Sequence, residues 1–171
     1  MDVLRGAIEA AKRNNISTVI VASTTGDTAL KVLGLVKLEK LKVIVVTHDE
    51  GRSLGERRFN EDIRMQLLAN NITVYTHNPP WFLLQKIMSK LLAKLGLLPW
   101  QRHLQEVKAK YGTGIKVCHI IARMLIEGRI LKDERIVAIA GTKNGADSAG
   151  IFLADAKKEW PILEEVIAGR T

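Results

Sequence analysis

The chain has 171 residues, a net charge of +8 and a single cysteine, with 47% hydrophobic and 26% charged residues. This length suits one domain with its own core over residues 1–171, and the composition excludes a disordered or disulfide-built protein. No apolar run reaches the roughly 18–20 residues that a membrane span needs, and the N-terminus has no signal-peptide pattern. We therefore expect a cytoplasmic protein.

Helical and strand patterns alternate along the chain. In chain order we expect a helix over 2–14, a strand over 18–23, a helix over 28–40, a strand over 42–47, a helix over 56–70, a strand over 73–76, helices over 81–95, 101–110 and 115–127, strands over 135–140 and 150–154, and a helix over 158–168. Apolar strands that alternate with helices predict an α/β fold with a mostly parallel sheet covered on both faces. The last strand follows a turn too short for a crossover, so we expect it to run antiparallel.

The loop after the first strand has the composition of a phosphate-binding turn. It opens a helix, whose free N–H groups favour an anion, and it combines hydroxyls with a glycine that permits close backbone approach. The residues concerned are Ser23, Thr24, Thr25, Gly26 and Thr28. Asp27 opposes a bound phosphate, and the alternative interpretation is a well-capped strand-to-helix turn.

Two further loops carry glycines and a lysine at the same expected edge of the sheet, where ligands of α/β sheets bind. One follows the fourth strand and repeats the pattern of the first loop; its candidate residues are Gly141, Thr142, Lys143 and Gly145. The other precedes a helix and includes a tyrosine suited to stacking on a planar ring; its candidate residues are Tyr111, Gly112, Thr113, Gly114 and Lys116. A simple turn at Gly145 and a flexible helix start are the alternatives.

Histidines follow the second and third strands at His48 and His77, where they are candidates for contact with a ligand. No metal-ligand spacing accompanies them, so we expect no metal. Cys118 and His119 are adjacent in a helix, with side chains about 100° apart, so they do not form a catalytic dyad. We expect Cys118 in the core, and the sequence identifies no catalytic residue.

Residues 81–100 combine a wide apolar face with lysines at every fourth position. This pattern favours a core or subunit-interface helix, and we expect a homo-oligomer formed through residues 81–100; the alternative is a basic amphipathic helix that lies on a membrane or acts as a lid. The net charge is concentrated nearby, because residues 86–132 hold ten basic and two acidic side chains while the rest of the chain balances.

The loop Val21–Ala29 resembles the phosphate loop in the C-terminal α/β domain of pyruvate kinase. The closer likeness is to a small stand-alone archaeal family of proteins similar to that domain, whose signatures resemble residues 46–48, 111–117 and 141–149. The resemblance implies a three-layer sandwich with strand order 3-2-1-4-5 and an antiparallel last strand. It also implies that the chain is not a pyruvate kinase, because the catalytic barrel of that enzyme has no counterpart in these 171 residues. The resemblance further makes FMN a candidate cofactor.

Together these patterns predict binding of a phosphorylated small molecule, with FMN as one candidate, at the carboxyl ends of the strands. A bound flavin would supply any redox chemistry itself. The alternative is an interaction module that uses residues 86–132 on nucleic acid or an anionic membrane, although no nucleic-acid motif supports it. A third hypothesis is a small hydrolase or transferase that uses His48.

Overall fold

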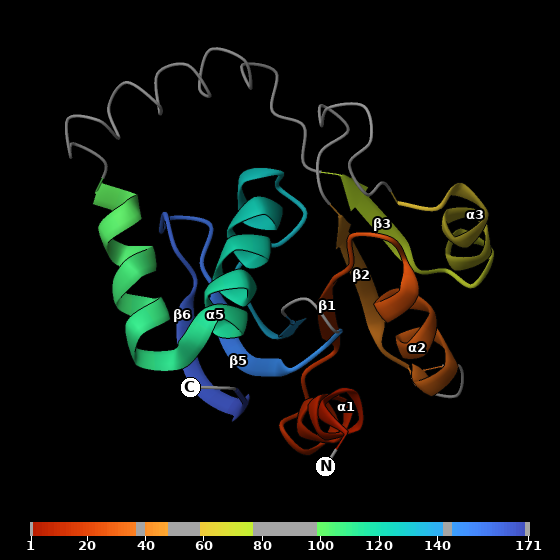
Figure 1. Cartoon of the computed structure of the whole chain (residues 1–171), viewed down its shortest axis with the longest axis horizontal. Helices are drawn as coiled ribbons and strands as arrows, with labels where there is room; N and C mark the ends of the chain where they lie inside the picture. Colours follow the sequence, from red (N-terminus) through yellow and green to blue (C-terminus); the bar gives the residue numbers. More distant parts are fainter. Residues whose placement is uncertain (1, 37–39, 48–58, 77–98, 142–144, 170–171) are drawn as a thin grey trace.

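The computed structural model describes residues 2–36, 40–47, 59–76, 99–141 and 145–169, without the side chains of 99–101 (Figure 1). The helix predicted over 81–95 and four candidate site residues, His48, His77, Thr142 and Lys143, lie outside these residues. None of the described helices combines the length and hydropathy required to cross a membrane.

The described elements largely follow the predicted order. They are α1 (Val3–Arg13), β1 (Thr18–Ala22), α2 (Asp27–Val36), β2 (Lys42–Thr47), α3 (Glu61–Ala69), β3 (Thr73–Thr76), α5 (Pro99–Glu127), β4 (Glu134–Ala140), β5 (Ser148–Ala154) and β6 (Ile162–Ala168). They form one sheet with strand order β3-β2-β1-β4-β5-β6. Strands β1 to β4 are parallel, and β5 runs antiparallel to β4, which confirms the predicted order.

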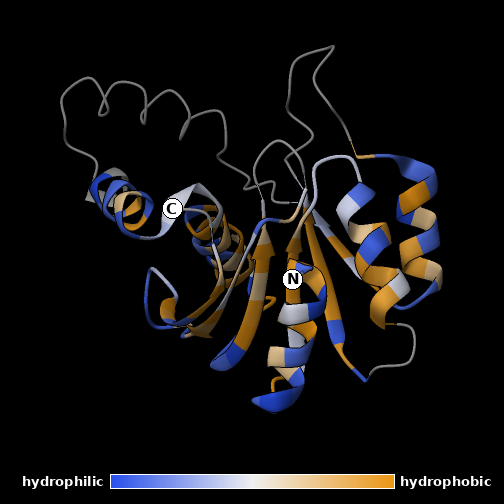
Figure 2. Cartoon of the chain, turned by 60° about the horizontal axis from the view of Figure 1, so that its bottom comes forward, coloured by the Kyte–Doolittle hydropathy of each residue, from blue (hydrophilic) through white to orange (hydrophobic). Residues whose placement is uncertain are grey.

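Two apolar cores cover the two faces of the sheet. Val19 and Val21 of β1 pack in a cluster with α1, α2 and Leu67 of α3, whereas Ile20 packs on the other face with α5. Because successive side chains of a strand point to opposite faces, a strand buried on both sides needs a continuous apolar run. The central strands are accordingly hydrophobic along most of their length (Figure 2). The three-layer prediction is confirmed.

The prediction of a closing helix over 158–168 is wrong, because residues 162–168 form the edge strand β6. Apolar residues at 162, 163, 166 and 167 suggest a helical period, but β6 pairs with β5 through register shifts that let it switch faces. Leu163 packs against the α5 core and Ile167 against the opposite core. Glu164 accepts a hydrogen bond of 2.8 Å from Arg135, which adds a cross-sheet ion pair. Tertiary pairing thus overrides the local helical pattern.

The two helices predicted over 101–110 and 115–127 are the two halves of α5, which bends at Gly112. The φ of Gly112 is 85° and its ψ is 174°, a backbone conformation that only glycine adopts easily. We call this bend the Gly112 kink. The second half of α5 packs on the sheet through Cys118 and Leu125, among others.

Candidate functional site

The loops that the sequence singles out leave the sheet at one edge, the carboxyl ends of the parallel strands. Val21 of β1 is level with Ile139 of β4, so Ser23 and Gly141 emerge from neighbouring strands. Ser148, the first residue of β5, is level with Ala140, and Ala149 is level with Ala168 near the end of β6. The end of β6 therefore lies at the same edge.

The first loop is held in a tight turn by its own groups. The buried Ser23 donates its backbone N–H to Val46, and its Oγ accepts a hydrogen bond of 3.2 Å from the N–H of Gly26. Gly26 has a φ of 108°, and a Cβ added there would lie 2.8 Å from Ile63. Thr25 donates a hydrogen bond of 2.6 Å to Asp27. The Ser23 hydroxyl therefore stabilises the turn, which agrees with the capped-turn interpretation for this residue.

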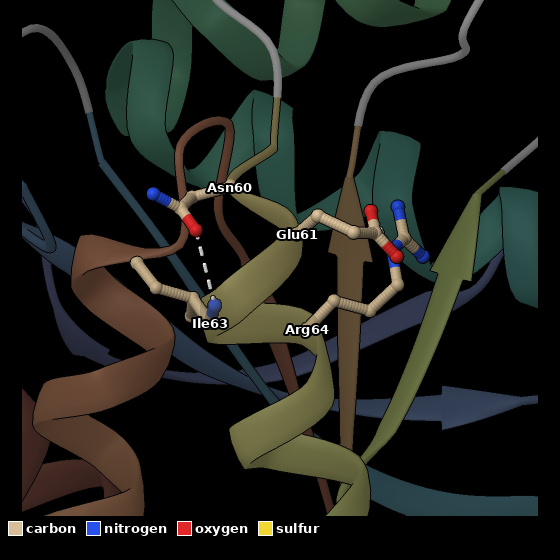
Figure 3. Close-up of polar contacts among 4 residues, drawn as sticks. All are labelled: Asn60, Glu61, Ile63 and Arg64. Atoms are coloured by element: carbon tan, nitrogen blue, oxygen red, sulfur yellow. Dashed lines mark hydrogen bonds and ion pairs between the residues drawn. The ribbon is translucent and has the colours of Figure 1, made fainter.

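The start of α3, whose own polar contacts are drawn in Figure 3, is fixed against the first loop. The backbone N–H of Asn60 donates to the carbonyl of Thr25 at 3.0 Å. The side-chain Oδ1 of Asn60 accepts a hydrogen bond of 3.1 Å from the N–H of Ile63. Arg64 pairs with Glu61 at 3.1 Å. Sequence reasoning did not single out Asn60 and Ile63 as supports of the loop. An asparagine followed by two acidic residues is nevertheless an N-cap signal that marks this helix start.

The Gly112 kink brings Gly114 against the loop that precedes β5. A Cβ added to Gly114 would overlap the Oγ and Cβ of Ser148 and would lie 2.9 Å from Oδ1 of Asp147. The same Asp147 oxygen accepts a hydrogen bond of 2.9 Å from Ser148. The structure thus joins two loops that the sequence placed near each other only by their strand positions.

Asp147, which was not among the candidate residues predicted from the sequence, also lies at this junction. Its carboxylate lies beside the first turn of the second half of α5, where the N-terminus of a helix favours an anion. Its charge also helps to raise the pKa of Cys118, a residue of that same helix. The protein therefore supplies its own anion at the kink. The parallel between Asp27 and Asp147 in the two repeated loop patterns was the signal available in the sequence.

Tyr111, Thr113 and Lys116 are the described candidates that flank the Gly112 kink and Gly114 along the chain. Tyr111 is half-buried, with the Nζ of Lys110 lying 5.0 Å from its ring centroid, while Thr113 is exposed and Lys116 is partly exposed. A hydrogen bond with Tyr111 raises the pKa of Lys110. The φ of Gly145 is 107°, which agrees with the turn predicted there.

Comparison with known families identifies the domain. Residues 2–151 match the family model described as pyruvate kinase, alpha/beta domain. The chain belongs to this family. Among solved structures it is similar to that of O-ureido-L-serine synthase, at 16% identity and a TM-score of 0.33. The match covers 82% of this chain and 50% of the other, so the chain spans about half the length of that protein. A likeness this weak carries no argument about activity.

In this pyruvate kinase α/β domain, Cys118 is a core residue, as predicted. It is fully buried and its Sγ donates to the carbonyl of Ala138 at 3.5 Å. Burial, followed by the charge of Asp147, raises the pKa of the Cys118 thiol well above its usual range. The adjacent His119 lies against Phe152 and His103 instead, so the two side chains do not meet as a dyad. No group of three or more metal-ligating side chains occurs in the described part of the chain.

Proposed function

We propose that this domain binds a phosphorylated small molecule at the carboxyl ends of β1 and β4, with FMN as the first candidate. The observation that carries the proposal is the convergence of three glycine-containing segments, 23–26, 112–114 and 145–147, at one edge of the sheet. Glycines at such a junction allow backbone N–H groups to approach a ligand closely.

The phosphate is expected at the first loop rather than at the kink, because the carboxylate of Asp147 already lies beside the kink. The first loop opens α2, and Thr24 and Thr28 add half-buried hydroxyls there. Asp27 is the adverse charge at this loop, and its hydrogen bond from Thr25 offsets part of that cost. Of the two candidate lysines, the structure describes Lys116, and we propose that its ammonium group balances the charge of the phosphate.

The non-phosphate part of the ligand is expected beside Tyr111. An aromatic side chain offers a face on which a planar ring can stack, and Tyr111 follows Lys110 immediately before the Gly112 kink. A flavin would supply redox chemistry when bound, and this chain would orient it. No residue is assigned a catalytic role in this proposal.

The test compares ligands that differ only in the phosphate. Absorbance spectra and native mass first show whether a ligand is bound to the purified protein. FMN and riboflavin are then titrated into the full chain by calorimetry, and sugar phosphates are titrated as a second series. The proposal expects FMN to bind at least about 10-fold more tightly than riboflavin, since a charge-assisted contact contributes roughly 1.5–3 kcal/mol. Equal affinity for both flavins, or no binding by any phosphorylated ligand, contradicts it.

Two lysine variants make the test specific to the site. Lys116→Gln removes a charge at the start of the second half of α5, whereas Lys132→Gln removes an exposed charge near the opposite edge, just before β4. Both variants change the net charge equally. Only Lys116→Gln is expected to weaken FMN binding, by roughly 3- to 10-fold at low salt. Equal weakening by both would indicate a general charge effect.

No described contact favours the alternative of nucleic-acid or membrane docking through residues 86–132. Arg102 pairs with Glu106 at 3.1 Å, and Arg123 pairs with Glu127 at 2.7 Å and with Glu159 at 3.0 Å. These pairs reduce the positive charge that the segment offers to an anionic surface. Steeply salt-dependent binding of RNA, DNA or anionic vesicles by the full chain would nevertheless establish that function.

A further inference from the structure

Two histidines from opposite sides of the Gly112 kink meet inside the protein. His103 belongs to the first half of α5 and His119 to the second, and their ring centroids lie 5.6 Å apart at an angle of 80°. The ring of His119 also lies edge-on to Phe152 of β5, with centroids 4.9 Å apart, and that of His103 lies 4.9 Å from Trp160. This row of rings joins both halves of α5 to the β5–β6 region.

Three of the four ring nitrogens at this contact are buried without a hydrogen-bond partner among the described residues. His119 is only 3% exposed, and neither its Nδ1 nor its Nε2 has a partner among the described residues; the same holds for Nε2 of His103. A buried polar atom without a partner is costly, and an apolar side chain of similar size would avoid that cost. The pair therefore calls for an explanation other than packing.

Among the described residues, no carboxylate pairs with the buried nitrogens of either ring. Arg123, four residues after His119, lies 4.2 Å above the Trp160 ring and pairs with Glu127 and Glu159. Both of these carboxylates are thus engaged by a guanidinium, and β5 contributes the uncharged Phe152. A proton on His119 would place a positive charge in buried, apolar surroundings beside a second imidazole.

We propose that the His103–His119 contact is an acid-sensitive latch, which holds the first half of α5 on the sheet while the His119 ring is neutral and releases it when that ring is protonated. The Gly112 kink is the hinge, because its glycine tolerates a change of backbone angles. Tyr111 precedes the hinge directly, so release would move a residue of the proposed ligand site. Acidification would thereby weaken ligand binding from a distance.

The direction of the effect follows from the pKa of His119. Burial, followed by the charge of His103, lowers that pKa from 6.5 to about 4. In the released form His119 has an ordinary pKa near 6.5, so this form binds a proton at a higher pH than the closed form does. The stability of the closed form relative to the released form therefore decreases as the pH falls from about 6.5 towards 4. For this histidine alone, acidification to pH 4.5 shifts the equilibrium towards the released form by about 80-fold.

The test monitors the contact in the full chain. The chain has three tryptophans, and replacing Trp81 and Trp100 with phenylalanine leaves Trp160, which faces His103, as the only tryptophan that is excited at about 295 nm. Its fluorescence and the hydrogen exchange of residues 102–111 are followed between pH 7.5 and 4.5. We expect both to change together below pH 6, with faster exchange in 102–111 than in the second half of α5.

Two variants separate this contact from other titrations. His119→Leu removes the titrating ring and is expected to abolish the acid change, whereas the double variant His48→Gln and His77→Gln is expected to retain it. An unchanged acid transition in His119→Leu overturns the proposal. If that variant does not fold, NMR titration of the parent decides: one histidine with a pKa well below 6 supports the latch, and four histidines titrating near 6.5 overturn it.

Discussion

Replacing Gly114 with alanine is expected to destabilise the protein, because the added Cβ has no room. It would overlap the Oγ and Cβ of Ser148 and lie 2.9 Å from Asp147. Ser148 is only 1% exposed, and its place in the sheet is fixed opposite Ala140 in the β4–β5 ladder. Either the start of β5 or the second half of α5 must shift, and both belong to the proposed ligand site.

The size of the effect follows from two opposing terms. Overpacking a filled site costs about 1–3 kcal/mol, while replacing glycine with alanine in a helix contributes up to about 1 kcal/mol of stability. Gly34 in α2 is the matched control, because a Cβ added there meets nothing within 4 Å. We expect Gly34→Ala to be neutral or stabilising, and Gly114→Ala to be less stable than the control by about 2 kcal/mol.

Urea denaturation measures this difference. With a slope of roughly 2–3 kcal/mol per molar urea, the two midpoints should lie about 1 M apart. Adding Ser148→Gly to Gly114→Ala should recover part of the loss, because the two positions are in contact and their effects are therefore not additive. Equal stability of Gly114→Ala and Gly34→Ala would refute the proposed contact between the kink and β5.

Three further variants or reactions probe the loop and the core. Gly26→Ala is expected to lower the free energy of unfolding by about 1–3 kcal/mol, since its φ is 108° and the new Cβ lies 2.8 Å from Ile63; an unchanged Tm would contradict this. Asn60→Ala removes the N-cap of α3 and should cost about 1 kcal/mol, whereas Asn60→Asp should not, as measured by urea denaturation. Because burial raises the pKa of the Cys118 thiol, a thiol reagent at pH 8 should modify the unfolded chain far faster than the native one; equal rates would show an accessible thiol.

The parallel strands and the helices on both faces of the sheet could be predicted because they depend on local sequence patterns. The continuous β-branched runs of β1 and β2 require burial on both faces, and this requirement already implies helices on either side. β6 was not predictable in the same way, because its apolar residues follow a helical spacing that only the irregular ladder with β5 makes compatible with a strand. Its structure depends on a partner that local sequence does not reveal.

The candidate site was predictable as a set of loops but not as a set of contacts. Glycines and hydroxyls after strands identify loops at the ligand-binding edge. The contact of Gly114 with Ser148 and the position of Asp147 depend on the direction that α5 takes after Gly112, which is a property of the packed molecule. For the same reason, the meeting of His103 and His119 across the kink carries no signature in their spacing.

The most direct test of the proposed function is to locate the bound phosphate on the isotope-labelled chain by NMR. We expect titration with FMN, and more weakly with inorganic phosphate, to shift the backbone amide signals of residues 23–28 first and those of 112–116 and 145–147 with them. Amides at the opposite edge of the sheet, such as 132–135, should remain unchanged. Shifts confined to other parts of the chain, or no shifts at millimolar ligand, would contradict a phosphate site at the carboxyl ends of β1 and β4.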